Sequence, residues 1–254
     1  MVRLGQNFLA DPNLLDAIVR DAGLGADDVV LEIGAGEGVL TERLARAATH
    51  VHAVELDRGL AGVLAPIAER PEVELHWADA MDFDLATLRP APTAVVSNLP
   101  YSVATPVILR TIEGLPSVRR WTVMVQREIA DRLRAEPGSR VYGSPSVLVQ
   151  LACEVKLLRT VDPAVFRPRP RVESAILGLR RTGPGADEAT RDLVRAAFAH
   201  RRKALARSLE HVRPGSLGPA RKALAALELP EDARAEALAP GQFAALSAKL
   251  HPAS

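Results

Sequence analysis

The chain has 254 residues, of which 48% are hydrophobic and 25% are charged, a composition typical of one large globular domain, or of one ordinary domain and a small one. Its single cysteine, Cys153, excludes an intrachain disulfide and any metal site built from several cysteines. No apolar run approaches the length of a membrane span, and the N-terminus lacks the apolar core of a signal peptide, so we expect a cytoplasmic protein with no membrane partner.

Charge is distributed unevenly along the chain. Residues 1–84 carry six basic and sixteen acidic side chains, a net charge of −10, whereas residues 85–254 carry 26 and 15, a net charge of +11. Such asymmetry favours a polyanion-binding face on the basic part. A solvated surface without a partner is the alternative.

The first predicted element is a helix. Asp11 is a typical N-cap, and the proline after it suits the first helical position. Apolar residues over 14–19 form one stripe at helical spacing. Two amide side chains, Gln6 and Asn7, precede this helix, and on their own they would indicate only a polar loop.

A glycine-rich turn follows the first buried strand. A strand over 29–33, a G-x-G-x-G turn over 34–38 and a helix over 41–48 form the layout of nucleotide-binding proteins. The third glycine of the dinucleotide fingerprint would fall at Val39, and Glu37 puts negative charge where a pyrophosphate would lie. The pattern therefore favours a neutral or cationic nucleoside over a dinucleotide.

The next two strands, over 51–55 and 73–76, both lead to carboxylates. Glu55 lies 19 residues after Gly36, near the spacing at which an acid accepts from ribose hydroxyls. Asp79 could accept from an adenine amine or only cap a turn. His52 and His76 have no partner at metal-binding spacing, so we interpret both as structural or solvated and expect no metal.

A fourth apolar strand, over 93–97, ends in the tetrapeptide Asn98-Leu99-Pro100-Tyr101. Pro100 cannot donate to a strand ladder, so the strand must end here, at the edge where open α/β sheets bind ligands. The Asn98 oxygen is a hydrogen-bond acceptor, and the Tyr101 ring can stack on a flat group. The set suits a planar base with an exocyclic amine; the alternative is a strand-ending turn stiffened by proline.

The remaining elements complete an α/β pattern. A helix over 106–113, a strand over 121–126 and an Arg-rich helix over 127–134 continue the alternation of a doubly wound parallel sheet. Segments near 155–161 and 174–179 are typical of a hairpin that closes one edge.

Between the two hairpin segments, Phe166 precedes three arginines that alternate with prolines: Arg167, Arg169 and Arg171. An aromatic ring beside arginines is typical of nucleic-acid binding. A polar linker is the alternative.

A breaker-rich segment over 182–186 predicts a linker, after which the chain turns helical up to residue 250. From residue 193 to residue 209 there is no acid, and Arg201, Arg202 and Lys203 stand together in this helical stretch. Such a cluster indicates phosphate contacts.

Together these motifs resemble the small-subunit ribosomal RNA adenine N6-dimethyltransferases over nearly the whole chain. The residues that carry the resemblance are Gly5–Leu9, Glu32–Gly38, Glu55, Asp79–Ala80, Asn98–Tyr101, Phe166–Pro170, Phe198–Lys203 and Arg234–Glu236. The Erm-type methyltransferases of large-subunit RNA share the motifs up to Phe166–Pro170, but the last two, Phe198–Lys203 and Arg234–Glu236, resemble the small-subunit family.

The resemblance implies an α/β, Rossmann-like class I S-adenosylmethionine-dependent methyltransferase fold with a small C-terminal helical domain. Residues 1–182 would form the catalytic domain and residues 183–254 an RNA-binding domain. The implied reaction is dimethylation at N6 of two adjacent adenosines in a hairpin loop near the 3′ end of 16S rRNA, by a metal-free monomer that contributes to small-subunit biogenesis.

The resemblance also assigns roles. The implied S-adenosylmethionine pocket comprises Gln6, Asn7, Leu9, Gly34, Gly36, Glu55, Asp79, Ala80 and Asn98. The implied catalytic residues are Asn98, Leu99, Pro100, Tyr101 and Phe166, with the Asn98 and Leu99 oxygens accepting the amine hydrogens and the two rings stacking on the base. The implied RNA contacts are Arg167, Arg169, Arg171, Arg201, Arg202 and Lys203.

Three alternatives stay open. An Erm-type enzyme would act on 23S rRNA and confer antibiotic resistance. A ribosome assembly factor that has lost activity is disfavoured because every expected cofactor position is present. A small-molecule methyltransferase is disfavoured by the Arg-rich tail.

Overall fold

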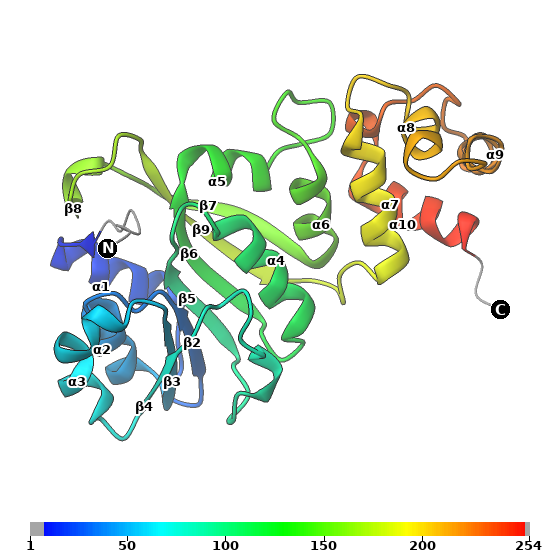
Figure 1. Ribbon diagram of the computed structural model, residues 1–254. Helices are drawn as coiled ribbons and strands as arrows, with labels where there is room; N and C mark the ends of the chain where they lie inside the picture. The colour runs from blue at the N-terminus through cyan, green and yellow to red at the C-terminus, as the bar shows by residue number, and fades with distance from the viewer. Residues whose placement is uncertain (1–7, 252–254) are drawn as a thin grey trace. The chain divides into compact units, whose positions relative to one another are not determined.

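The computed structural model describes residues 8–251, which divide into two compact units (Figure 1). The first unit holds the described residues up to Ala130 together with Glu154–Arg181. The second holds Asp131–Cys153 together with the described residues from Thr182 onward. None of the helices within residues 8–251 is long and apolar enough to cross a bilayer.

The first unit is built on a seven-stranded sheet. Its strands are β2 (Val29–Ile33), β3 (His50–Glu55), β4 (Val73–Trp77), β5 (Ala94–Asn98), β6 (Arg120–Gln126), β7 (Cys153–Val161) and β9 (Ser174–Arg181). The spatial order is β4-β3-β2-β5-β6-β9-β7, with β2 to β6 parallel and β9 antiparallel to β6. The predicted α/β class and the mainly parallel sheet are thus confirmed, and the two late strands do extend one edge.

Helices cover this sheet, and a small second sheet lies beside it. The helices are α1 (Pro12–Ala22), α2 (Val39–Ala47), α3 (Ala61–Ala68), α4 (Ala104–Gly114) and α5 (Arg127–Leu133), the last of which runs into the second unit. The small sheet pairs β1 (Phe8–Leu9) with β8 (Phe166–Arg167) in antiparallel register. The chain segment before α1 is therefore tied to the Arg-Pro segment more than 150 residues later.

The first helix begins as the sequence predicts. The Asp11 carboxylate accepts from the N–H groups of Asn13 and Leu14 at 2.8 and 3.1 Å, which satisfies two of the unpaired donors of the first turn. Gly23 ends the helix with a φ of 56°, a left-handed conformation that glycine adopts without a Cβ clash.

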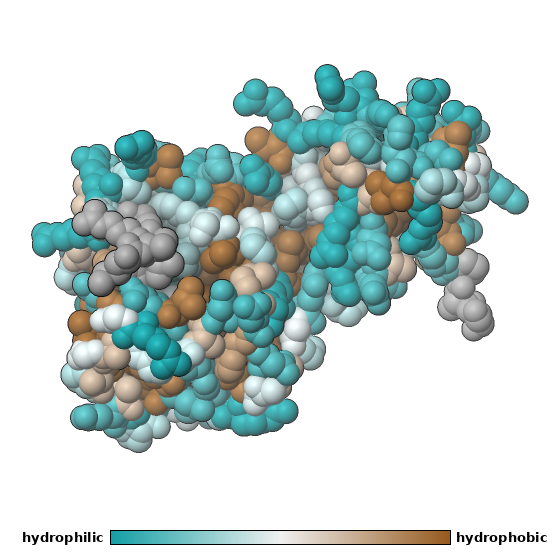
Figure 2. All heavy atoms as spheres, viewed as in Figure 1, coloured by the Kyte–Doolittle hydropathy of each residue, from teal (hydrophilic) through white to brown (hydrophobic). Residues whose placement is uncertain are grey.

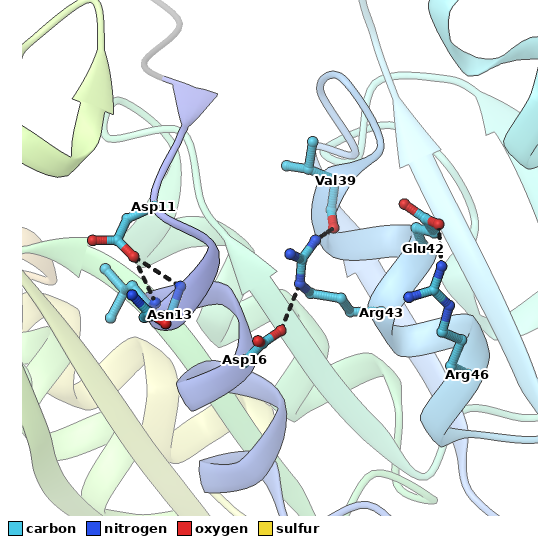
Figure 3. A network of polar contacts seen from close by, with 8 residues as sticks. Asp11, Asn13, Asp16, Val39, Glu42, Arg43 and Arg46 are labelled. Atoms are coloured by element: carbon cyan, nitrogen blue, oxygen red, sulfur yellow. Dashed lines mark hydrogen bonds and ion pairs between the residues drawn. The ribbon is translucent and has the colours of Figure 1, made fainter.

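The helix after the glycine turn is held against α1 by an ion pair (Figure 3). The Arg43 guanidinium lies 2.7 Å from the Asp16 carboxylate and also donates to the Val39 carbonyl at 2.9 Å. Arg46 pairs with Glu42 one turn away on α2. Because these side chains are partly exposed, the pairs contribute little stability, and most of it comes from the buried faces of the two helices.

The strand that leads to the tetrapeptide lies at the centre of the sheet. The Ser97 hydroxyl accepts from the Ile33 N–H at 2.9 Å, and the Leu99 N–H donates to the Met124 carbonyl at 3.1 Å. The end of β5 is therefore fixed to both neighbouring strands, β2 and β6. Parallel pairing brings the carboxyl ends of these strands to one edge of the sheet.

The second unit is helical, with α6 (Ser144–Ala152), α7 (Glu188–Ala199), α8 (Leu205–Val212), α9 (Leu217–Ala225) and α10 (Pro240–Leu250). Its core includes the ring of Phe198, whose centroid lies 6.0 Å from that of Tyr142 and 5.8 Å from that of Phe243. The buried Tyr142 hydroxyl donates to the Leu238 carbonyl at 2.9 Å.

The division of the chain differs from the predicted boundary at residue 182. Residues 131–153 belong to the second unit by their contacts, because α6 packs against α7 and α10. The sequence does not show this, since an apolar helix face does not say which partner covers it.

Candidate functional site

The glycine turn between β2 and α2 requires glycine at each of its three positions. Gly34, Gly36 and Gly38 have φ values of 81°, 58° and 78°, which side chains rarely adopt. A Cβ at Gly38 would lie 2.2 Å from the end of the Ile67 side chain. A Cβ at Gly34 would lie 3.4 Å from the Pro100 ring and so fill the space between the turn and the tetrapeptide.

Glu55, at the end of β3, is bound to this turn. Its Oε2 accepts from the Gly36 N–H at 2.8 Å, and its Oε1 accepts from the N–H groups of Leu56 and Asp57 at 2.9 and 2.8 Å. A carboxylate offers about four acceptor positions, so three are used and about one is left for a ligand. The side chain is 4% exposed.

A second carboxylate, Glu32, lies just before the turn, and we assigned it no role from the sequence. It is 1% exposed on β2, and its Oε2 has no hydrogen-bond partner among residues 8–251. Burial raises its pKa to about 8; the Thr41 hydroxyl opposes this rise and the Glu55 charge adds to it. The available signal was an acid inside the apolar run 29–33, which seldom occurs without a functional reason.

Asp79 lies after β4, beside the end of β3. The Ala78 N–H donates to the Glu55 carbonyl at 3.0 Å, so the segments that carry the two carboxylates are hydrogen-bonded to each other. Asp79 is exposed, and its Oδ1 accepts from the Met81 N–H at 2.8 Å, which confirms the turn-capping interpretation. Its contact with an adenine amine stays a prediction, as does that of Ala80, which is half-buried.

The tetrapeptide ends the central strand β5 as predicted. Asn98 is partly exposed and Leu99 is buried, whereas Pro100 is exposed and its carbonyl accepts from the Val103 N–H at 3.1 Å. The half-buried Tyr101 has its hydroxyl 2.6 Å from the Ser174 Oγ, and burial raises its pKa.

Of the predicted residues near the N-terminus, Gln6 and Asn7 lie outside the described range. Leu9 is 5% exposed and is paired with Phe166 across the small sheet. The Phe8 ring lies 3.3 Å from where a Cβ of Gly36 would be, so β1 passes over the glycine turn. Phe8, the residue that follows Asn7 in the sequence, therefore lies next to Gly36.

Phe166 departs from the expectation of an exposed stacking ring. It is 2% exposed and belongs to the hydrophobic core. Stacking on a base would require this ring to become exposed, so the role stays a prediction.

The predicted RNA contacts fall into two groups. Arg167, Arg169 and Arg171 are exposed on the first unit, and Arg169 lies 3.8 Å from Asp162. In the second unit, much of the surface around α7 and α8 is hydrophilic in the view of Figure 2.

Residues 201–203 form the turn between α7 and α8 and are not helical, which corrects the predicted helical stretch. The helix ends because Ser208 accepts from the His200 N–H at 3.2 Å and donates to the Ala196 carbonyl at 2.7 Å. Arg201 forms an ion pair with Glu236 at 2.8 Å. Arg202 and Lys203 border a hollow of about 500 Å³. Its other charged lining residues are the basic Arg207, Arg221 and Arg234 and the acidic Glu231 and Asp232.

Comparisons with known proteins agree with this geometry. The family model described as ribosomal RNA adenine dimethylase matches residues 2–251. The ribosomal RNA small subunit methyltransferase A of Rubrobacter xylanophilus is 45% identical over 98% of this chain and 95% of the relative.

Two solved structures are also similar. A dimethyladenosine transferase from Plasmodium falciparum has a TM-score of 0.80 and 25% identity, covering 94% of this chain and 95% of its own. The 23S rRNA methyltransferase ErmE has a TM-score of 0.70 and 28% identity, covering 96% and 99%. With a match over nearly its full length and the glycine turn, acidic strand ends and tetrapeptide in place, the chain belongs to the ribosomal RNA adenine dimethylase family.

Proposed function

We propose that this chain transfers methyl groups from S-adenosylmethionine to N6 of two adjacent adenosines in a hairpin loop near the 3′ end of 16S rRNA. The observation that supports it most is the meeting of the glycine turn with the Asn98–Tyr101 tetrapeptide at one sheet edge, where a Cβ on Gly34 would already lie 3.4 Å from the Pro100 ring. The relatives that are about 45% identical are named for the small ribosomal subunit, which favours 16S over 23S rRNA.

The residues around the turn suit a cationic nucleoside. Glu32 and Glu55 are buried acidic side chains on adjacent strands, and one oxygen of Glu32 has no partner in the described part of the chain. A bound cation would favour the ionised form of Glu32. In this proposal Glu55 accepts from a ribose hydroxyl and Asp79 from the adenine amine. The bound cofactor supplies an electrophilic methyl group.

The tetrapeptide would present the target amine. The nitrogen is a poor nucleophile because its lone pair is delocalised into the base. Acceptance of its two hydrogens by the Asn98 side-chain oxygen and the Leu99 carbonyl would favour a pyramidal nitrogen with its lone pair directed at the methyl group. Positioning of this kind supplies much of the rate in bimolecular transfers. Tyr101 would stack on the base after its extrusion from the RNA.

RNA would be held by the exposed cations. Arg167, Arg169 and Arg171 on the first unit, and Arg202 and Lys203 on the second, carry charges that can neutralise phosphates. Arg201 is expected to contribute less because Glu236 already pairs with it. We propose that the protein acts as a monomer in the cytoplasm, on immature small subunits.

The test is transfer of labelled methyl groups from S-adenosylmethionine to three substrates: immature small subunits, naked 16S rRNA and large-subunit RNA. We expect label on two adjacent adenosines of 16S rRNA, and labelling about 10²- to 10³-fold slower with the Asn98→Ala variant. Label confined to 23S rRNA would identify an Erm-type enzyme instead. Tight subunit binding without any label would favour an assembly factor.

A further inference from the structure

Three histidines and a glutamate lie close together on one face of the sheet, on β3 and the edge strand β4. His50 and His52 are two residues apart on β3, and Glu74 and His76 are two residues apart on β4. Residues at this spacing in a strand point to the same face. The parallel register places His52 opposite Glu74. The interpretation of His52 and His76 as lacking a partner at metal-binding spacing is therefore wrong, because their ring nitrogens lie 3.2 Å apart.

The donor atoms have the spacing of a metal site. His52 Nδ1 lies 3.2 Å from both His76 Nε2 and a Glu74 oxygen, and His50 Nε2 lies 3.6 Å from the same oxygen. Ligands at about 2.0–2.2 Å from a tetrahedral zinc ion stand about 3.3 Å from one another. The donors of His50, His52 and Glu74 all lie within 4.8 Å of one another, so small side-chain rotations are enough to enclose an ion.

The rings are also oriented for coordination. His52 Nε2 lies 2.9 Å from the Pro90 carbonyl, which can only accept, so this nitrogen carries the proton and Nδ1 directs its lone pair into the cluster. A carbonyl that orients a histidine in this way is typical of protein metal sites. His50 Nε2 is buried and has no hydrogen-bond partner among the described residues.

Burial and access complete the site. The His52 side chain is fully buried, so its position is fixed by the packing of the sheet. The Glu74 side chain is 51% exposed, which gives an ion from solvent a way in. His52 precedes Glu55 by three residues, about 10 Å along an extended strand, so the cluster is separate from the glycine turn.

We propose that His50, His52, Glu74 and His76 bind one divalent transition-metal ion, with Zn²⁺ as the best match. Three imidazoles and one carboxylate are ligands that zinc accepts in four-coordinate sites, and hard ions such as Mg²⁺ prefer oxygen ligands. The ion holds β3 and β4 together at the edge of the sheet, and no step of methyl transfer depends on it.

The experiment measures Zn²⁺ binding to untagged, chelator-treated full-length protein by competition with a chromophoric chelator. We expect one ion per chain. The single variants His50→Gln and Glu74→Gln each weaken binding at least tenfold, and the double variant abolishes the site. The His50 and Glu74 side chains are 19% and 51% exposed, so the variants should stay folded, which circular dichroism checks.

His211→Gln is the matched control. His211 also neighbours another histidine ring, that of His200, with centroids 5.0 Å apart, but it lies on α8. The control should bind Zn²⁺ like the wild type. As a second readout, Co²⁺ should give the intense visible absorption of tetrahedral coordination in the wild type and not in the double variant. Absence of a stoichiometric ion in the wild type, or equal loss in His211→Gln, would overturn the proposal.

Discussion

Replacing Glu55 with glutamine should weaken S-adenosylmethionine binding about 10- to 150-fold. Three backbone N–H groups already use the Glu55 carboxylate, which leaves about one acceptor position for a ribose hydroxyl. If the glutamine oxygen keeps the bonds to Leu56 and Asp57, the glutamine NH₂ group faces Gly36. An NH₂ group is only a donor, so it can accept neither from the Gly36 N–H nor from a ribose hydroxyl. A hydrogen bond to a charged group contributes about 1.5–3 kcal/mol, and each 1.4 kcal/mol is about tenfold in the dissociation constant.

The assay is titration calorimetry with S-adenosylmethionine, with Glu37→Gln as the matched control. Glu37 is exposed on the same glycine turn, so its replacement removes the same charge without removing a bond to Gly36. If a general negative field attracted the cofactor, both variants would lose affinity equally; a local hydrogen bond predicts loss in Glu55→Gln alone. An affinity within twofold of the wild type for Glu55→Gln would refute the assignment.

The fold must be checked separately, because Glu55→Gln leaves the Gly36 N–H without its acceptor. An unsatisfied buried donor costs about 1–3 kcal/mol, and each kcal/mol lowers the unfolding midpoint of a chain of this size by about 2–4 °C. Thermal unfolding without cofactor should therefore show a modest decrease, with a cooperative transition well above the temperature of the calorimetry.

Asn98→Ala should lower single-turnover methylation on saturating substrate by about 10² to 10³, because the amine loses a positioned acceptor, with unchanged RNA affinity; a near wild-type rate would reduce the tetrapeptide to a turn. Neutralising Arg202 and Lys203 together should reduce the slope of log affinity for RNA against log salt by about 1.4–1.8, and an unchanged slope in filter binding would mean that they are only solvated. Glu32→Gln should flatten the pH dependence of stability. The pKa of Glu32 is raised to about 8 in the folded state, so the folded protein holds this proton more tightly than the unfolded chain does. The resulting contribution to the free energy of unfolding is complete below the ordinary pKa near 4.5 and is lost as the pH rises to 8. Urea unfolding at pH 5, 6.5 and 8 measures how the free energy of unfolding falls with pH. We expect this fall to be smaller in the variant, by up to about 1.4 kcal/mol per pH unit. An equal fall in the two proteins would contradict the prediction.

The sheet, and the edge where its glycine turn and tetrapeptide lie, were predictable because they depend on local pattern. The apolar run over 29–33, the glycines after it and the proline that ends β5 each restrict the backbone in one way. The Asp11 cap is equally local, and the structure confirms it. These signals need no knowledge of distant contacts.

The features that could not be predicted all depend on pairs far apart in the sequence. Arg201 and Glu236 are 35 residues apart, so an acid-free stretch around the arginine still acquires a counter-ion. Phe166 is paired with Leu9 of β1, which precedes it by more than 150 residues, and its ring is buried. His52 and His76 meet only because β3 and β4 pair in parallel register. Phe166→Ala is therefore no simple test of the implied stacking role, because it would remove a core ring and cost about 3–5 kcal/mol of stability.

The chain passes between its two units three times, after residues 130, 153 and 181, and this constrains the order in which the units can fold. Domains tend to fold in order of synthesis, but β9 pairs between β6 and β7, so the first sheet stays incomplete until residue 181 has left the ribosome. By then α6 has already emerged without α7 and α10, the helices that bury its apolar face. A C-terminal fragment cut at residue 182 would lack α6 altogether. The helical unit is therefore not a module that recombination can move as one continuous gene segment.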